Sequence, residues 1–185
     1  MTRYTALFVV AVAIVFCNCA IDHSEKVDSL KDLRSDEAGF QMKVPCESVL
    51  KRSEEDAYKN GIQVSYSYRC SKDDLRLLVS FLDHNPDAPA PLETLFGYAT
   101  GNFEFATKSL NVEMSEMRSI GGFPAKSYVI KGNGKVGYGL VTTNEKGSLT
   151  ISISFPDDAA RPTKDYEKDR LLAQQIVSSV AYVRK

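Results

Sequence analysis

Apolar and polar residues alternate along most of the chain, which is the pattern of β-strands with one buried face. In the clearest run, Ile62, Val64, Tyr66, Tyr68 and Cys70 face one side and polar residues face the other. Shorter runs of the same kind predict strands over residues 40–44, 75–82, 112–120, 124–131, 136–140 and 149–155. Pieces rich in glycine and asparagine between these runs predict tight turns, so we expect antiparallel hairpins.

Two segments have helical spacing instead. In the first, the apolar residues fall on one stripe of a helix that begins near Pro91: Leu92, Leu95, Phe96, Ala99, Phe103, Ala106 and Leu110. The second helix is predicted from Thr163, a residue type that caps helices, with Leu172, Ile176 and Val180 on its buried side. Residues 182–183 follow it as a short last extension.

Two glycines interrupt the first predicted helix. Gly97 and Gly101 project opposite the apolar stripe, and Tyr98 and Phe105 project near them. An exposed glycine costs a helix about 1 kcal/mol relative to alanine, so one interpretation is a weak or kinked helix. In the other interpretation, Gly97, Tyr98, Gly101 and Phe105 form a candidate partner surface, where small residues admit a partner between two aromatic rings.

The order of the elements predicts an α+β fold. Three strands, a helix, four strands and a second helix follow one another, and cleanly two-sided strands are typical of antiparallel sheets. We therefore expect a single twisted, mainly antiparallel sheet of about six or seven strands, with the two main helices packed on it. Leu78 and Leu82 lie on the second face of strand 75–82, which predicts that part of this strand is covered on both sides.

The N-terminal part of the chain has a different composition. Arg3 precedes an unbroken apolar run over residues 6–16, which is shorter than the roughly 20 residues needed to span a bilayer but fits a secretory signal. We predict a signal peptide at residues 1–20, a polar linker at 21–38 and the folded domain at 39–185. The linker is expected to be mostly disordered, with at most a short helical turn around Leu30 and Leu33. The alternative to a cleaved signal is an uncleaved N-terminal anchor.

Cys17, Cys19 and Ala20 are small residues where a signal peptidase would cut, on one side of Ala20 or the other. Lipid attachment to one of these cysteines is a minority alternative, because Phe16 and Asn18 stand where a small residue normally precedes a lipidated cysteine. The sequence thus predicts a periplasmic or secreted protein, which touches a membrane only through its signal or through a lipid anchor.

Cys46 and Cys70 are the cysteines of the predicted domain. In an oxidising compartment an even pair is more often a disulfide than a metal site, and the spacing fits no redox or zinc motif. A bridge that closes a loop of this length, about 25 residues, would contribute roughly 3 kcal/mol to stability. Two free thiols in the core are the alternative.

The charged residues and histidines give little support for nucleic-acid binding, for a metal site or for catalytic carboxylates. A net charge of −1 with scattered Lys and Arg argues against nucleic-acid binding. His84, with Asp83 and Asp87, is a weak metal candidate, because a lone histidine among turn residues is usually solvated. The carboxylates at 54–56 and 157–158 lie in polar loops, where solvated charges are the rule.

The methionines suggest a second metal, because thioethers bind copper(I). Met42, Met114 and Met117 lie in different predicted strands or on different strand faces, so core filling or surface scatter accounts for them better. We predict no catalytic, cofactor-binding or metal-binding residue.

The order of these elements resembles the PsbP-like superfamily, over residues 39 to 184. The resemblance is carried by the opening Gly39-Phe40-Gln41-Met42-Lys43-Val44-Pro45, the helix 92–110, the turn Gly121-Gly122-Phe123-Pro124-Ala125 and a terminal helix that ends near Val180. It implies a PsbP-type fold and a noncatalytic domain that works by contact with other proteins. It implies no ligand and no site residue here.

Two functional hypotheses follow. The first is a noncatalytic exported accessory domain that binds a protein or an envelope component through one sheet face, the outer side of the first helix or the loop 46–61. The second is a binder of small hydrophobic ligands or a weak hydrolase, with an apolar pocket between helix and sheet that is lined by Tyr66, Tyr68 and Phe103.

Overall fold

The computed structural model describes residues 30–47, 50–53, 62–84, 91–101, 111–132, 134–157 and 163–183. The predicted signal peptide and the start of the predicted linker lie outside these ranges. Among the helices that the structure describes, none is long and apolar enough to span a membrane.

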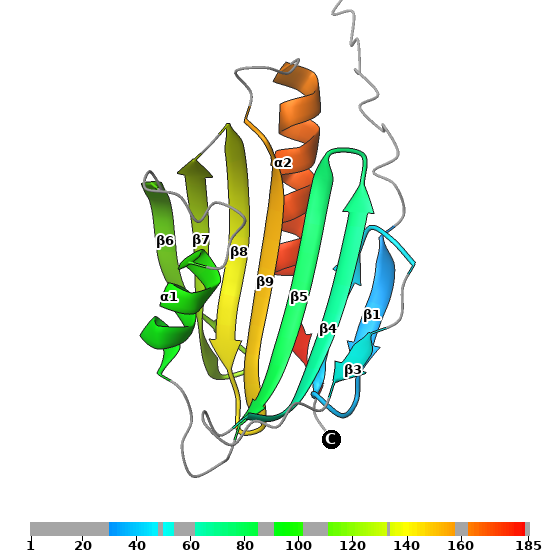
Figure 1. Cartoon of the computed structure of the whole chain (residues 1–185), viewed down its shortest axis with the longest axis vertical. Coiled ribbons are helices and arrows are strands. Elements are labelled where there is room, and N and C mark those ends of the chain that lie inside the picture. Colours follow the sequence, from blue (N-terminus) through cyan, green and yellow to red (C-terminus); the bar gives the residue numbers. More distant parts are fainter. Residues whose placement is uncertain are drawn as a thin grey trace, which may run out of the picture.

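A seven-stranded antiparallel sheet forms the centre of the described part of the chain (Figure 1). Its strands, from one edge to the other, are β3 (Lys51–Ser53), β4 (Ile62–Lys72), β5 (Leu75–His84), β9 (Gly147–Pro156), β8 (Lys135–Thr143), β7 (Phe123–Gly132) and β6 (Asn111–Ile120). Each pair of neighbours is antiparallel, as the alternating pattern predicted. The predicted strands from residue 62 onward all lie in this sheet.

The prediction of a single sheet was wrong, because β2 (Phe40–Val44) leaves the large sheet and forms a second one. Within the described residues this second sheet has three strands, with β1 (Lys31–Ser35) on one side of β2 and β10 (Ala181–Tyr182) on the other. The predicted extension after the last helix is therefore a strand. The small sheet packs on one face of the large sheet, since Phe40 and Met42 belong to the same buried cluster as Phe81 and Ile151.

The start of the domain also differs from the prediction. We placed residues 21–38 in a disordered linker, but β1 lies inside that segment and pairs with β2 residue by residue. Leu33 is buried, and the turn that follows closes with a hydrogen bond from the Gly39 N–H to the Ser35 carbonyl (2.8 Å). Gly39 has a φ of +72°, a backbone conformation that favours glycine. The folded part thus begins before residue 39, and Leu33 is in a strand and not in a helical turn.

The two helices of the described chain pack on opposite faces of the large sheet (Figure 1). Helix α1 (Leu92–Gly101) buries Leu95 and Ala99 against Tyr128, Ile130 and Val141. Helix α2 (Thr163–Ser178) lies with the small sheet on the other face, where its buried side joins the main core. The result is three layers: α1, the large sheet, and a third layer shared by α2 and the small sheet. The prediction that α1 continues to Leu110 falls on residues outside the described ranges.

Candidate functional site

The large sheet ends in a long strand with an open edge. β6 is the last strand in the sheet, and in the described part of the chain it pairs only with β7. Every residue from Asn111 to Met117 is exposed, including Val112 (44%), Met114 (50%) and Met117 (58%). A single exposed apolar residue is ordinary, but several together on a strand with free backbone groups mark a place where another chain can bind.

The opposite edge of the same sheet is built differently. β3 has three residues, Lys51, Arg52 and Ser53, and all of them are exposed. Short edge strands with positive side chains are a common way to prevent pairing with another chain. β6 is ten residues long, so it offers a much longer row of backbone hydrogen-bonding groups than β3 does.

A bulge divides the apolar residues of β6 between both faces of the sheet. The register shifts between Val112 and Met114, so that Val112 lies opposite Ile130 and Met114 lies opposite Val129. Ile130 belongs to the α1 face and Val129 to the α2 face. Met117 lies opposite Lys126, on the α1 face again. A strand that binds alongside β6 would therefore meet apolar side chains above and below its backbone.

The neighbourhood of Met117 is held in place by contacts with α1. The Lys126 ammonium group lies 2.9 Å from the Glu93 carboxylate and 4.0 Å from the centre of the Phe96 ring. Phe96 in turn makes an edge contact with Tyr128, with ring centres 5.4 Å apart. Tyr128 is buried, and this burial raises its pKa to about 12. The surface next to β6 is thus a fixed part of the core on which α1 packs.

The α2 face of β6 carries charges. Glu113 lies 3.4 Å from Lys131 in an ion pair. Glu116 is exposed, and Arg118 is half-buried with its guanidinium 3.5 Å from the Val177 carbonyl. Glu116 and Arg118 lie opposite Ser127 and Ala125, so both side chains are on the same face of the sheet. Neither of them makes an ion pair with another described residue.

The partner surface predicted on the first helix is described only in part. Gly97 is exposed, and a Cβ added there would meet no atom within 4 Å. This agrees with the prediction that Gly97 projects away from the apolar stripe. The side chain of Tyr98 is outside the described structure, and so is Phe105, while Gly101 ends the described helix. The surface formed by Gly97, Tyr98, Gly101 and Phe105 stays a prediction.

Tyr66 and Tyr68 do not face α1, which corrects the pocket that we predicted between helix and sheet. Both rings are in the main core on the α2 side of the sheet. The Tyr68 hydroxyl donates to the Cys46 carbonyl (2.9 Å), and the Tyr66 hydroxyl donates to the Glu37 carboxylate. That hydrogen bond raises the pKa of Tyr66, and burial raises the pKa of Tyr68. The third predicted lining residue, Phe103, lies outside the described ranges.

A hollow of about 140 Å³ lies elsewhere, at one end of the large sheet. It is lined by charged side chains from the β4–β5 turn, from β5 and from β8, chiefly Asp73, Asp74, Arg76 and Lys135. Its position and polarity differ from those of the predicted apolar pocket.

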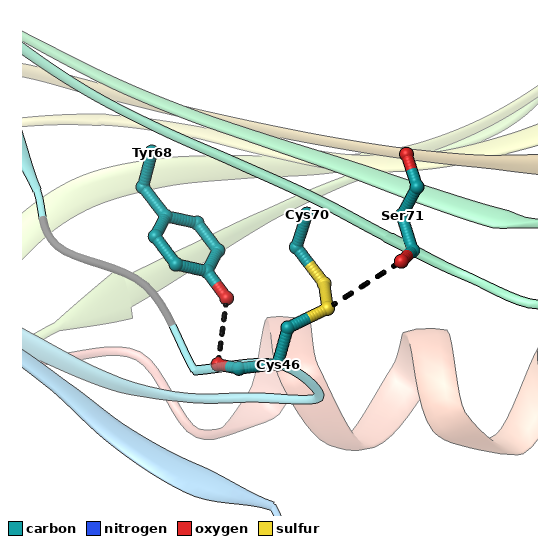
Figure 2. Close-up of a disulfide and its surroundings, with 4 residues drawn as sticks. All are labelled: Cys46, Tyr68, Cys70 and Ser71. Carbon is teal, nitrogen blue, oxygen red and sulfur yellow. Dashed lines mark hydrogen bonds between the residues drawn. A yellow bond between two sulfur atoms is a disulfide. The ribbon is translucent and has the colours of Figure 1, made fainter.

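A disulfide joins Cys46 and Cys70, as predicted, with the two Cα atoms 6.0 Å apart (Figure 2). Cys46 follows β2, and Cys70 is in β4, so the bridge ties the small sheet to the large one. Figure 2 shows the Tyr68 hydroxyl bound to the Cys46 carbonyl beside the bridge, which fixes the same short segment a second time. The bond has a structural position between the two sheets, where Cys70 is buried and Cys46 is half-buried.

The residues considered for metal binding are not brought together. Met42 is buried in β2, whereas Met114 and Met117 are exposed on opposite faces of β6. Asp83 lies near the end of β5, but the His84 side chain and Asp87 are outside the described structure, as are residues 54–56 and 158. Within the described ranges, no group of three or more His, Cys, Asp or Glu side chains is placed to hold a metal ion.

The β6 edge was missed from the sequence. Met114 and Met117 were considered only as copper ligands or as scattered surface residues. A signal was present, because the apolar residues of this segment, Val112, Met114, Met117 and Ile120, break the alternation that residues 62–70 and 149–155 keep. However, the order of strands in the sheet decides which strand lies at its edge, and the alternation of apolar and polar residues does not reveal that order.

No known protein family matches the chain, and no curated protein does. Among solved structures, the fold is similar to that of cyanobacterial PsbP (CyanoP) from Synechocystis sp. PCC 6803, with a TM-score of 0.54 and 15% identity over 86% of this chain and 95% of that one. The Ran-binding protein Mog1p of Saccharomyces cerevisiae aligns with a TM-score of 0.49 and 13% identity, over 84% of this chain and 96% of that one. The predicted PsbP-like resemblance is thus confirmed for the fold.

Proposed function

We propose that this PsbP-like domain is a noncatalytic binding module that works by contact with protein, and that the β6 edge is its binding surface. The observation that carries the proposal is the exposure of Val112, Met114 and Met117 along the open edge of a ten-residue strand. This exposure supports the β6 edge as a surface that recognises another polypeptide.

The chemistry of the edge fits the addition of a strand from a partner. The outer side of β6 presents backbone N–H and C=O groups, which provide affinity when an extended segment pairs with them. The side chains of Met114 and Met117, on opposite faces, then supply apolar contacts to alternate residues of the incoming strand. Methionine is flexible and polarisable, so it adapts to partners of different shape.

The outer surface of α1 is a second part of the proposal. Gly97 leaves open space on the side of the helix that faces away from the sheet. With Tyr98, Gly101 and Phe105 it would extend a contact surface on the α1 side of the molecule. A partner bound at β6 would approach from that side whenever it contacts Met117.

We also propose that the domain acts outside the cytoplasm, in the periplasm or after secretion. The apolar run at residues 6–16 supports a signal peptide, and the Cys46–Cys70 bridge suits an oxidising compartment. The mass of the intact, natively exported protein tests this. Cleavage near residue 20 without added lipid is expected, whereas an uncleaved chain or a lipid on Cys17 or Cys19 would indicate membrane anchoring.

Photo-crosslinking in the native cell tests the binding surface. A photoreactive amino acid replaces Met117 in the full chain, and Leu171 of α2 is the matched control, because the two side chains are 58% and 50% exposed. Position 117 is expected to give a defined protein adduct that position 171 does not give. A second substitution, Met114→Lys, should abolish the adduct. Identical adducts from both positions, or none from position 117, would contradict the proposal.

A further inference from the structure

We infer that the strand bound at the β6 edge is β6 of a second copy of this chain, paired antiparallel about a two-fold axis through Met117. The inference rests on the proposed binding edge and adds the identity of the partner. It follows from the charges and apolar residues of the regular part of β6, Met114–Ile120.

A two-fold axis restricts which residues can face one another. Residues directly opposite each other in an antiparallel pair lie on the same face of the sheet, and side chains alternate between faces along a strand. In a continuous sheet formed by two copies, a residue must therefore meet either its own equivalent or one an even number of positions away. The axis consequently passes through a residue of β6 and not between two residues.

With the axis at Met117, the two strands complement each other at successive positions. The two Met117 side chains meet on the α1 face. Glu116 lies opposite Arg118 of the second copy on the α2 face, and symmetry repeats this ion pair. Met114 lies opposite Ile120 of the second copy, which joins two apolar residues. Each of these pairs combines residues that share a face in the structure.

The other registers lack this complementarity. An axis at Glu116 or at Arg118 places two like charges opposite each other, which is destabilising. An axis at Ser115 places Glu116 opposite Met114, so that the carboxylate faces an apolar side chain. Glu113 cannot pair with Arg118, because the bulge between Val112 and Met114 interrupts the alternation there and Glu113 is already paired with Lys131.

Among the described residues, nothing competes as an ion-pair partner for Glu116 or Arg118. Glu116 is exposed, and the Arg118 guanidinium uses one contact with the Val177 carbonyl out of five N–H donors. Neither makes an ion pair within the described part of the chain. The Glu116–Arg118 ion pairs on the α2 face and the Met117 pair on the α1 face thus favour one register, and they favour a second copy of this chain as the partner.

Cysteine trapping tests the register in the full-length protein. In the Met117→Cys variant the two new thiols would lie opposite each other, with Cβ atoms about 5 Å apart. In the Met114→Cys variant they would be offset by six positions, or about 20 Å. Mild oxidation should therefore give a covalent dimer for Met117→Cys and not for Met114→Cys. The wild type, which contains Cys17 and Cys19, sets the background.

Charge reversal is the second test, by sedimentation equilibrium. Glu116→Arg or Arg118→Glu alone creates two like-charge pairs and should raise the dimer Kd by about tenfold at low salt. The double variant, E116R/R118E, restores both pairs in reverse and should return the Kd to near the wild-type value. Leu171→Lys, a matched substitution on α2, should leave the Kd unchanged.

Several results would overturn the inference. A wild type that stays monomeric at all concentrations, or a dimer trapped equally well at positions 114 and 117, excludes the proposed pairing. So does a dimer whose Kd ignores both single charge reversals. If the protein is monomeric but position 117 still gives a defined adduct with a different protein in the cell, the second-copy inference fails and the proposed binding edge stands.

Discussion

The substitution Gly139→Ala tests how α1 is docked on the sheet. Tyr128 of β7 lies beside Gly139 of β8, and its ring crosses Gly139 to bring its hydroxyl within 3.4 Å of Ser152 on β9. A Cβ added at Gly139 would lie 2.1 Å from the ring Cζ and 2.2 Å from the hydroxyl oxygen. The absence of a side chain at residue 139 is therefore what allows Tyr128 to occupy this place.

The cost of the extra methyl group follows from the packing. To reach an ordinary contact of 3.4 Å, the ring must move by 3.4 − 2.1 = 1.3 Å. Tyr128 is only 1% exposed and contacts Phe96 of α1, so no free space receives it. Overpacking costs about 1–3 kcal/mol. Partial loss of the ring contact and of the hydroxyl contact with Ser152 adds to this, so we expect about 2–4 kcal/mol in total.

Urea unfolding of the wild type, Gly139→Ala, Tyr128→Ala and the double variant measures this cost. Tyr128→Ala alone should cost about 3–5 kcal/mol, because it leaves a cavity under α1. In its background the added methyl group meets no ring, so Gly139→Ala should be neutral or slightly stabilising there. If Gly139→Ala costs less than about 0.5 kcal/mol alone, or costs the same in both backgrounds, the steric reasoning is wrong.

Three further predictions concern separate parts of the molecule. Gly97→Ala should raise the free energy of unfolding by up to about 1 kcal/mol in urea titrations, because the site is open and alanine favours helix. Replacing both Cys46 and Cys70 by alanine should lower it by about 3 kcal/mol, since a bridge with a sequence separation of 24 restricts the unfolded chain. Burial raises the pKa of Tyr128 and of Tyr182 to about 12. Above pH 10 the unfolded state therefore loses these protons first, and stability should fall by about 1.4 kcal/mol per tyrosine at pH 11. Tyr182→Phe should remove part of that alkaline loss, measured by urea unfolding between pH 9 and 11.

The clearest long strands, β4 and β9, were predictable because each buries one alternating face. Residues 62–70 and 149–155 keep this alternation, and both lie in strands of the large sheet. The short strands left no such signal. β1 buries only Leu33 and Ser35 among charged neighbours, and β3 buries none of its residues, so both exist through their partners in the sheet. Local composition therefore pointed to a linker where β1 forms.

Periodicity also does not say which face of a sheet a helix covers. We expected part of strand 75–82 to be covered on both sides, from Leu78 and Leu82, but Leu78 is 37% exposed and Leu82 is only half-buried. The cover on both sides is at β8 instead, where residues 136–142 are all buried between α1 and the third layer. Tyr128 and Val129 are adjacent in β7 and belong to separate buried clusters, one on each face. In the sequence, the signal of burial on both sides was a continuous run without charged residues, such as 136–142. A leucine on the second face of an alternating strand was not such a signal.

The arrangement of the layers explains why β6 can serve binding without serving the core. α1 contacts β7, β8 and β9, and α2 contacts β2, β8 and β9, so the described helices pack mainly beside β6 and not on it. The methionines of β6 consequently contribute little buried surface to folding. Leu171 of α2 is just as exposed, but its helix satisfies its own backbone hydrogen bonds and gives a partner strand nothing to pair with. At β6, exposed apolar side chains coincide with an outer row of backbone groups that no described strand pairs with, and recognition of another strand requires that combination.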